Sequence, residues 1–440
     1  MSTSDKAVVV PKELLIPFIL ITSLFALWGF ANDITNPMVS AFKKVLELNN
    51  TQASWVQMAF YGGYFTMALP AAIFAKRYTY KKGILLGLAL YAIGALLFYP
   101  AAAYEEFIFF LLALYILTFG LAFLETTANP FILSMGPEET ATQRLNLAQA
   151  FNPIGALAGL FAAQTFILGS LQSDDLDAAG NPIYDSLTAS AKAAVRTGDL
   201  MVIRNPYVIL GLVVIGILVL IAVVNMPEKE EKDLGGSVGT AIARIFRGAK
   251  FREGVLAQMF YVGAQIMCWT YIYQYAESIG IDNRSAVPYA MTALGVFLVG
   301  RWICTWLLRY YSGGKLLLIF SALAAVFTLG AIFIQGMTGL YSLVMISFCM
   351  SLMFPTIYGL ALEDLGDDAK YGAAFLVMAI VGGAIMPLAQ GVLLDIGGSG
   401  YTDTLILGVP EVNFSFVLPL FCFVMVGLYG YRVNKMNTAA

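Results

Sequence analysis

The chain has 440 residues, of which 59% are hydrophobic and only 12% are charged, and its formal net charge is −3. This charged fraction is about half of what soluble domains carry, and the mean hydropathy is +0.78. The composition therefore excludes an ordinary soluble domain and indicates a protein embedded in a membrane.

Apolar windows of about 18 to 25 residues recur along the whole chain, and this length suits a hydrocarbon core of roughly 30 Å. They predict an all-α membrane protein with twelve transmembrane helices. The predicted spans are residues 14–37, 53–75, 83–101, 105–133, 143–169, 204–226, 254–278, 286–309, 315–334, 339–362, 371–393 and 412–431.

The first span holds polar residues at a depth that a bilayer disfavours. Asn32, Asp33 and Asn36 lie in the stretch LFALWGFANDITNPM. An ionisable group at membrane depth costs roughly 2.5 to 3.5 kcal/mol on insertion scales, and it usually persists because a substrate, ion or proton pathway needs it. Trp28 lies inside the same span, where its ring is placed to stack on a substrate; membership of an interfacial belt is the alternative.

The fourth span holds a second acid, Glu125, followed four residues later by Asn129. Residues at this spacing share one helix face. Burial penalises the ionised form of a carboxylic acid and so raises its pKa. A proton carrier needs such a pKa, because external protons must be able to titrate it. We therefore assign proton binding to Asp33 and proton exchange to Glu125. Hydrogen bonding to neighbouring helices is the bland alternative for both acids.

Amide side chains gather in the same half of the chain, and packing alone rarely requires so many. We expect them to orient the transported substrate. The candidate amides are Asn32, Asn36, Gln57, Asn129, Gln149 and Asn152.

A charged, glycine-containing stretch at residues 227–252 separates six spans from six. We expect an amino-terminal bundle at residues 1–228, a cytoplasmic linker at 229–252 and a carboxyl-terminal bundle at 253–440. In both halves a proline-containing helix leads through an acidic loop into a Gly/Ala-rich helix. Repeated halves are typical of transporters that rock two bundles about a midplane site, and small residues there allow close helix approach.

The second half adds three candidates. Gln265 and Trp269 lie in the seventh span, and both are predicted to bind substrate. Arg301 is the only basic residue expected inside a span. It either snorkels to the headgroups beside Arg309 or pairs with a carboxylate or backbone carbonyl in one conformational state and forms a gate.

Both termini are expected in the cytoplasm. An even number of spans places them on one side, and cytoplasmic loops retain Lys and Arg. This assignment puts 18 Lys and Arg residues on the cytoplasmic side and 6 on the other, with Arg301 inside a span. The first apolar run is too long for a removable signal peptide and lacks a small-residue cleavage site, so we expect it to remain as a span.

Six short stretches, spread over most of the chain, carry a family resemblance. They are SLFALWGFAN, AFYGGYF, GLAFLETTANPF, GPEE followed by RLNLAQAFN, YVGAQIMCWTY, and FPTIYGLALEDLG. Together they resemble the L-fucose:proton symporters of the major facilitator superfamily. The resemblance implies a sugar held near the midplane between two six-helix bundles, with carboxylates in spans one and four that tie protonation to sugar binding. Glu125 matches the family's span-four acid, and Asn32, Gln149 and Asn152 also match. On this resemblance the substrate is a sugar: Glu125 accepts hydrogen bonds from its hydroxyls, the candidate amides orient it, and the rings of Trp28 and Trp269 stack on it.

Two departures from the family affect polar groups. The family carries Asn where this chain has Asp33, and Asp where it has Asn36; the two positions are about one helical turn apart on one face. Phe354 stands where the family presents Tyr, and Met353 stands where it presents Gln. Loss of groups that hydrogen-bond a hydroxyl changes which sugar is favoured.

The leading prediction is a proton-coupled symporter of L-fucose or a closely related monosaccharide, acting by alternating access in a bacterial inner membrane. One alternative is sodium-coupled symport of glucose, galactose, mannose or an N-acetylated hexose, with Asp33 as an ion ligand. Another is a sugar sensor with a transporter fold. The expected partners are the sugar, the coupling ion and membrane lipid, and we expect a monomer.

Several functions are disfavoured by what the sequence lacks. It has no His and no phosphate-binding glycine loop, so an enzyme or an ATP-driven pump has little support. Charge and motifs give none for nucleic-acid binding. The four cysteines all fall within spans, where we expect small buried side chains and neither disulfides nor a metal site. We therefore expect no cofactor and no metal.

Overall fold

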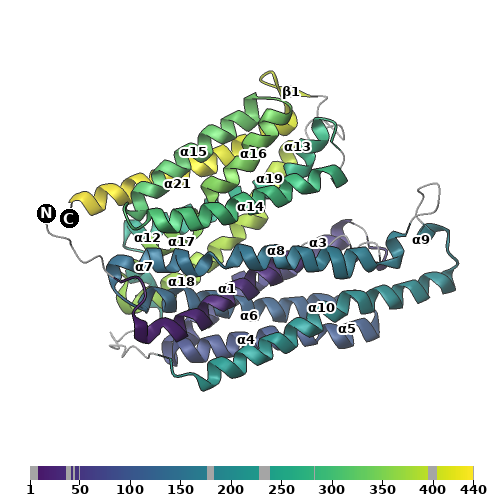
Figure 1. The fold of residues 1–440 in the computed structure, drawn as a ribbon, viewed down its shortest axis with the longest axis horizontal. Helices are drawn as coiled ribbons and strands as arrows, with labels where there is room; N and C mark the ends of the chain where they lie inside the picture. Colours follow the sequence, from purple (N-terminus) through teal and green to yellow (C-terminus); the bar gives the residue numbers. More distant parts are fainter. Residues whose placement is uncertain are drawn as a thin grey trace. The chain divides into compact units, whose positions relative to one another are not determined.

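The fold is given by a computed structural model that describes residues 8–35, 41–42, 45–48, 50–175, 183–226, 238–281, 283–394 and 404–439 (Figure 1). Their regular structure is helical apart from one antiparallel pair of strands, β1 (Leu405–Ile406) and β2 (Val409–Pro410). Among the described residues, 11 helical stretches are long and apolar enough to cross a membrane, and a bent helix pair makes a twelfth. The prediction of an all-α protein with twelve spans is confirmed.

The chain divides into two compact units, which are described one at a time. The amino-terminal unit comprises Ile19–Ala128 and Ile154–Lys229, and the carboxyl-terminal unit comprises Met1–Phe18, Asn129–Pro153 and Glu230–Ala440. The predicted bundle boundaries at residues 228 and 253 stay a prediction.

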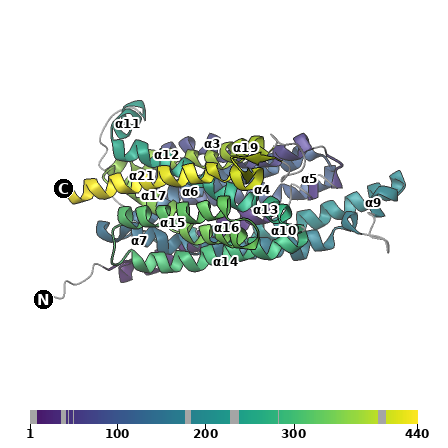
Figure 2. The same cartoon turned by 90° about the horizontal axis from the view of Figure 1, so that it is seen from above.

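In the amino-terminal unit α10 runs alongside α4 (Figures 1 and 2). The rings of Phe98 and Tyr207 stack with centroids 3.9 Å apart, and the Lys81 ammonium donates to the carbonyl of Val224 at 2.8 Å, just beyond the end of α10. The helices that lie wholly or mainly in this unit are α1 (Leu15–Thr35), α3 (Asn50–Arg77), α4 (Tyr80–Leu96), α5 (Phe98–Tyr104), α6 (Phe107–Ser134), α8 (Asn152–Ala162), a π-helical turn (Ala163–Ile167), α9 (Ile183–Ser186) and α10 (Ala189–Val223).

In the carboxyl-terminal unit α21 lies beside α15 in both views (Figures 1 and 2). Its helices are η1 (Lys12–Leu14), η2 (Glu138–Thr140), α7 (Ala141–Gln149), α11 (Val238–Ile245), α12 (Ala249–Thr270), α13 (Ile272–Ser278), α14 (Asn283–Leu307), α15 (Gly313–Phe333), α16 (Met337–Met350), α17 (Met353–Leu362), η6 (Gly366–Asp368), α18 (Ala369–Met378), η7 (Ala379–Val381), α19 (Gly382–Leu394), α20 (Glu411–Ser415) and α21 (Val417–Ala439).

Several predicted spans are not single helices. The seventh is bent by 40° between α12 and α13, the tenth is divided into α16 and α17, and the fifth and eleventh are interrupted near their middles. Hydropathy does not reveal these breaks, because it is averaged over windows of bilayer length that run across them.

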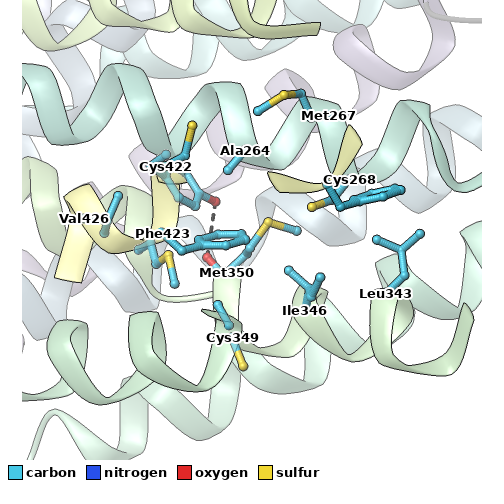
Figure 3. Packing of buried hydrophobic residues seen from close by; sticks show 14 of the residues in the cluster. Ala264, Met267, Cys268, Leu343, Ile346, Cys349, Met350, Cys422, Phe423 and Val426 are labelled. Carbon is cyan, nitrogen blue, oxygen red and sulfur yellow. Dashed lines mark hydrogen bonds between the residues drawn. The ribbon is translucent and has the colours of Figure 1, made fainter. Parts of the chain in front are cut away.

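A cluster of apolar side chains forms the core of the carboxyl-terminal unit, and Figure 3 shows the part of it that comes from α12, α16 and α21. Met350 and Phe423 are fully buried in it, and the Tyr261 hydroxyl donates to the Met350 carbonyl at 3.2 Å. Between membrane helices such clusters gain mainly from close van der Waals contact. All four cysteines, Cys268, Cys304, Cys349 and Cys422, are buried and free, as predicted.

The internal repeat extends to the backbone. α7 follows the turn η2 and is broken from α8, while α18 follows the turn η6 and is broken from α19 by η7. A methyl group at Gly155 would overlap the carbonyl of Ala26 in α1, and one at Gly382 would overlap that of Met259 in α12. Glycine thus permits the close helix approach that the small residues predict.

A fully buried arginine, Arg144, fixes the end of α6. Its guanidinium donates to the carbonyls of Ile132 at 2.8 Å and Leu133 at 2.5 Å, and to that of Val9 at 3.0 Å. The last carbonyls of a helix have no donor within the helix, and a cation there also complements the helix dipole. Arg144 therefore caps the helix that carries Glu125 and Asn129.

Candidate functional site

Glu125 is buried in the middle of α6, with only 7% of its surface exposed. It interacts electrostatically with the Tyr64 hydroxyl of α3. The two helices approach closely, since a methyl group at Gly63 would lie 2.8 Å from the side chain of Thr118. The carboxylate therefore lies among helices rather than in lipid.

Trp28 joins this group from α1. Its indole N–H donates to the Tyr64 hydroxyl at 2.8 Å, and the side chain is 4% exposed. The Phe25 ring lies 5.4 Å away, centroid to centroid. Because its N–H is used inside the protein, Trp28 fixes the Tyr64 hydroxyl beside Glu125; stacking on a sugar remains a prediction.

Asp33 is half-buried one helical turn beyond Trp28 and interacts electrostatically with Tyr61 of α3. Its neighbour Asn32 has a buried amide oxygen without a hydrogen-bond partner among the described residues. Asp33 and Glu125 thus each interact with a tyrosine, and both tyrosines belong to α3. Two predicted residues cannot be placed in this way: Asn36 lies outside the described residues, and so does the side chain of Gln57 on α3.

In the carboxyl-terminal unit the predicted residues Asn129, Gln149 and Arg301 form a hydrogen-bonded chain. The Gln149 amide donates to the Asn129 amide oxygen at 2.9 Å. Arg301, 3% exposed, makes longer contacts to the Gln149 carbonyl at 3.4 Å and to its side-chain oxygen at 3.5 Å. Among the described residues Arg301 has no carboxylate partner, and its burial contradicts the snorkelling alternative.

Aromatic rings complete the surroundings of Arg301. Its guanidinium lies 4.9 Å from the centroid of the Phe297 ring, within the range of a cation–π contact. The ring of Trp269 meets Phe297 edge-on at 5.2 Å, and its N–H donates to Ser347 at 3.1 Å. Gln265 is half-buried one turn before Trp269 on α12.

The two departures in the tenth span lie in apolar surroundings. Met353 is fully buried, and the half-buried Phe354 ring lies 6.3 Å from the Tyr261 ring and 6.1 Å from the Tyr358 ring. The carboxyl-terminal unit therefore has aromatic rings at this point of the tenth span.

The remaining predicted amide, Asn152, is half-buried at the start of α8.

Sequence reasoning missed the aromatic partners. Tyr61 and Tyr64 lie within AFYGGYF, one of the stretches that carry the resemblance, so a signal was available. Phe297 gave none, because a phenylalanine in an apolar span looks like any packing residue. Among the described residues no group of three or more His, Cys, Asp or Glu could hold a metal ion.

Residues 19–389 match the Major Facilitator Superfamily. The chain belongs to this family. The chain is also similar to the L-fucose-proton symporter of Haemophilus influenzae, to which it is 54% identical over 431 residues, covering 98% of this chain and 99% of the relative.

Two further relatives extend the comparison within the superfamily. The L-fucose-proton symporter of Escherichia coli is 35% identical over 97% of this chain and 94% of the relative; its solved structure superposes with a TM-score of 0.85 at 33% identity, covering 96% of this chain and 99% of that one. A glucose/galactose transporter of Brucella abortus is 31% identical over 94% of this chain and 93% of the relative. The chain is thus a multi-pass membrane protein whose relatives are transporters, not enzymes.

Proposed function

We propose that this protein is a secondary active transporter that carries L-fucose or a closely related monosaccharide together with a proton, by alternating access, in a bacterial inner membrane. The observation that carries the proposal is Glu125, a buried carboxylate within an apolar helix. Identity of 54% to the H. influenzae symporter along nearly the whole of both chains supports the substrate and the coupling ion.

We assign different roles to the acids of the amino-terminal unit and to the amide and aromatic side chains of the carboxyl-terminal unit. Glu125 exchanges a proton and accepts hydrogen bonds from sugar hydroxyls, while Asp33 binds the coupling proton. Both acids interact electrostatically with a tyrosine of α3. Protons do not cross the membrane without sugar if each acid gains or loses its proton only when sugar binds or leaves.

In the carboxyl-terminal unit, amides and aromatic rings supply recognition. Asn129, Gln149 and Asn152 offer both donors and acceptors, which suits hydroxyls, and Trp269 offers a ring face and Gln265 an amide. Arg301 acts as a gate, because its long contacts to Gln149 can be made and released without separating it from a carboxylate. The transporter is proposed to work as a monomer in contact with membrane lipid.

The direct test is uptake of radiolabelled L-fucose into proteoliposomes under separately imposed proton and sodium gradients, with unlabelled glucose, galactose and mannose as competitors. Accumulation driven by the proton gradient alone is the expected result. Accumulation that needs sodium, or binding of fucose without accumulation, would contradict the proposal.

A second candidate differs in its sugar. The similarity to the B. abortus glucose/galactose transporter, together with Phe354 and Met353 in place of polar residues, favours a hexose that makes fewer hydrogen bonds to the tenth span. Glucose or galactose competing far better than L-fucose in the same assay would select this candidate.

A further inference from the structure

A carboxylate that the transport proposal does not use lies at the start of α20. Glu411 is fully buried, and neither of its carboxylate oxygens has a hydrogen-bond partner among the described residues. Its backbone N–H donates to the Thr404 carbonyl at 3.1 Å, and both β1 and β2 contact α20. The side chain is thus enclosed where the hairpin meets the helices of the carboxyl-terminal unit.

A second unpartnered acceptor lies beside the same short helix. Gln390 of α19 donates from its amide nitrogen to the Ser415 hydroxyl at 2.9 Å, and that hydroxyl donates to the Val412 carbonyl at 2.7 Å. The amide oxygen of Gln390 is buried without a partner among the described residues. Ser415 follows Glu411 by four residues, which places both on one side of the helix. Three buried oxygen acceptors therefore face a shortage of donors.

The neighbouring side chains do not supply the missing donor. The Asn413 amide donates to the Tyr275 hydroxyl at 2.9 Å and to the Ala331 carbonyl at 2.8 Å, and Tyr275 in turn donates to Ala331 at 3.0 Å. The charged groups of the packed elements do not help either: Glu277 of α13 is an exposed acid, and Lys315 belongs to the first turn of α15, far along that helix from Ala331.

We propose that a monovalent cation binds between α19 and α20, with the Glu411 carboxylate and the Gln390 amide oxygen as ligands. Carboxylate and amide oxygens suit hard cations. A cation held by both side chains would satisfy all three oxygens at once, whereas a side-chain donor reaches one or two. A single carboxylate balances a single positive charge, and a buried carboxylate is retained when it is paired or coordinated.

The site is separate from the proposed coupling residues Asp33 and Glu125, which lie in other helices of the other unit. Its expected effect is on stability: the ion ties the short helix α20 to α19 and so holds the connection between the last two spans. A ligand that binds only the folded protein raises its stability with concentration.

The test uses the full-length protein in detergent micelles, with Na⁺ as the probe ion. The thermal unfolding midpoint is measured at neutral pH while NaCl replaces choline chloride at constant ionic strength. We expect the midpoint to rise with Na⁺ and to saturate, and calorimetric titration of wild-type protein with NaCl to give a saturable heat. Glu411→Gln is expected to lose the rise, and Glu277→Gln, which changes an exposed acid on α13, to keep it.

Three results would overturn the proposal. The first is a wild-type midpoint that NaCl and choline chloride affect equally. The second is a full sodium effect in Glu411→Gln. The third is no saturable heat for wild-type protein, combined with a midpoint that depends on pH and not on Na⁺, which would mean that Glu411 carries a proton instead. The wild-type titration decides the question even where the variant does not fold. Failure of proton-driven fucose uptake would leave these results unchanged.

Discussion

The charged site residues of the two units carry opposite charges. In the amino-terminal unit the charged groups are carboxylates, Asp33 and Glu125, and each interacts electrostatically with a tyrosine of α3. In the carboxyl-terminal unit the charged site residue is Arg301, held by an amide side chain, a backbone carbonyl and an aromatic ring. A carboxylate can gain and lose a proton in a transport cycle, whereas a guanidinium stays charged. On the roles proposed above, the first unit couples transport to protons and the second responds by moving a fixed charge.

Removing the charge of Glu125 is expected to have the largest effect on transport. Glu125→Gln should abolish accumulation and weaken sugar affinity about 10- to 100-fold, because hydrogen bonds to charged groups contribute about 1.5 to 3 kcal/mol and about 1.4 kcal/mol is a factor of ten. Uptake into proteoliposomes and calorimetric sugar binding measure the two effects. Glu139→Gln, at an exposed acid of the α6–α7 connection, is the matched control. Accumulation at the wild-type level in Glu125→Gln would contradict the assignment of proton coupling to the carboxylates of the amino-terminal unit.

Asp33→Asn separates coupling from sugar movement. Because Asp33 is assigned the coupling proton, this variant should no longer accumulate sugar above the outside concentration, while exchange of labelled for unlabelled sugar continues. Counterflow in proteoliposomes measures exchange, and the imposed-gradient assay measures accumulation. Asp175→Asn, at an exposed position, should behave as wild type. Loss of exchange together with accumulation would assign Asp33 to the sugar site instead.

Arg301→Met distinguishes a moving charge from a structural one. Arg301 is buried without a carboxylate partner among the described residues, so its replacement by an apolar side chain of similar length should leave the unfolding midpoint equal or higher. Transport should fall about tenfold, since a charge-assisted hydrogen bond is lost. Arg309→Met, at an exposed arginine of the same region, is the control. A lower midpoint with unchanged transport would make Arg301 purely structural.

The smallest expected effect concerns the ring beside Arg301. Trp269→Phe keeps an aromatic face but loses the N–H donated to Ser347, which should reduce sugar affinity about two- to tenfold, given a typical hydrogen bond of about 0.5 to 1.5 kcal/mol. Ser347→Ala and the double variant complete a cycle that isolates the bond. Trp306→Phe, at an exposed ring, should leave affinity unchanged. An equal loss in that control would point to a general effect on the fold.

The sequence by itself determined the spans and most of the candidate polar residues. Apolar windows long enough for a bilayer leave little choice of secondary structure, because a backbone in hydrocarbon must satisfy its own hydrogen bonds. Polar residues such as Glu125 and Gln149 are conspicuous in such windows for the same reason. The stretches that carry the family resemblance also pointed to the superfamily that residues 19–389 match.

Only the tertiary structure decided which side chains meet. Tyr64, Phe297 and Ser347 became partners of the predicted residues because packed helices bring distant segments together, and no local pattern encodes that choice. The sequence left two interpretations of Arg301 open, snorkelling to the headgroups and a gate. Only its burial against Gln149 in the structure argues against snorkelling. Glu411 had no signal at all: it stands just outside the last predicted span, where an acid normally faces water, and it is buried because α19 and the strands β1 and β2 pack against α20. Burial depends on what covers a residue, and the cover comes from elsewhere in the chain.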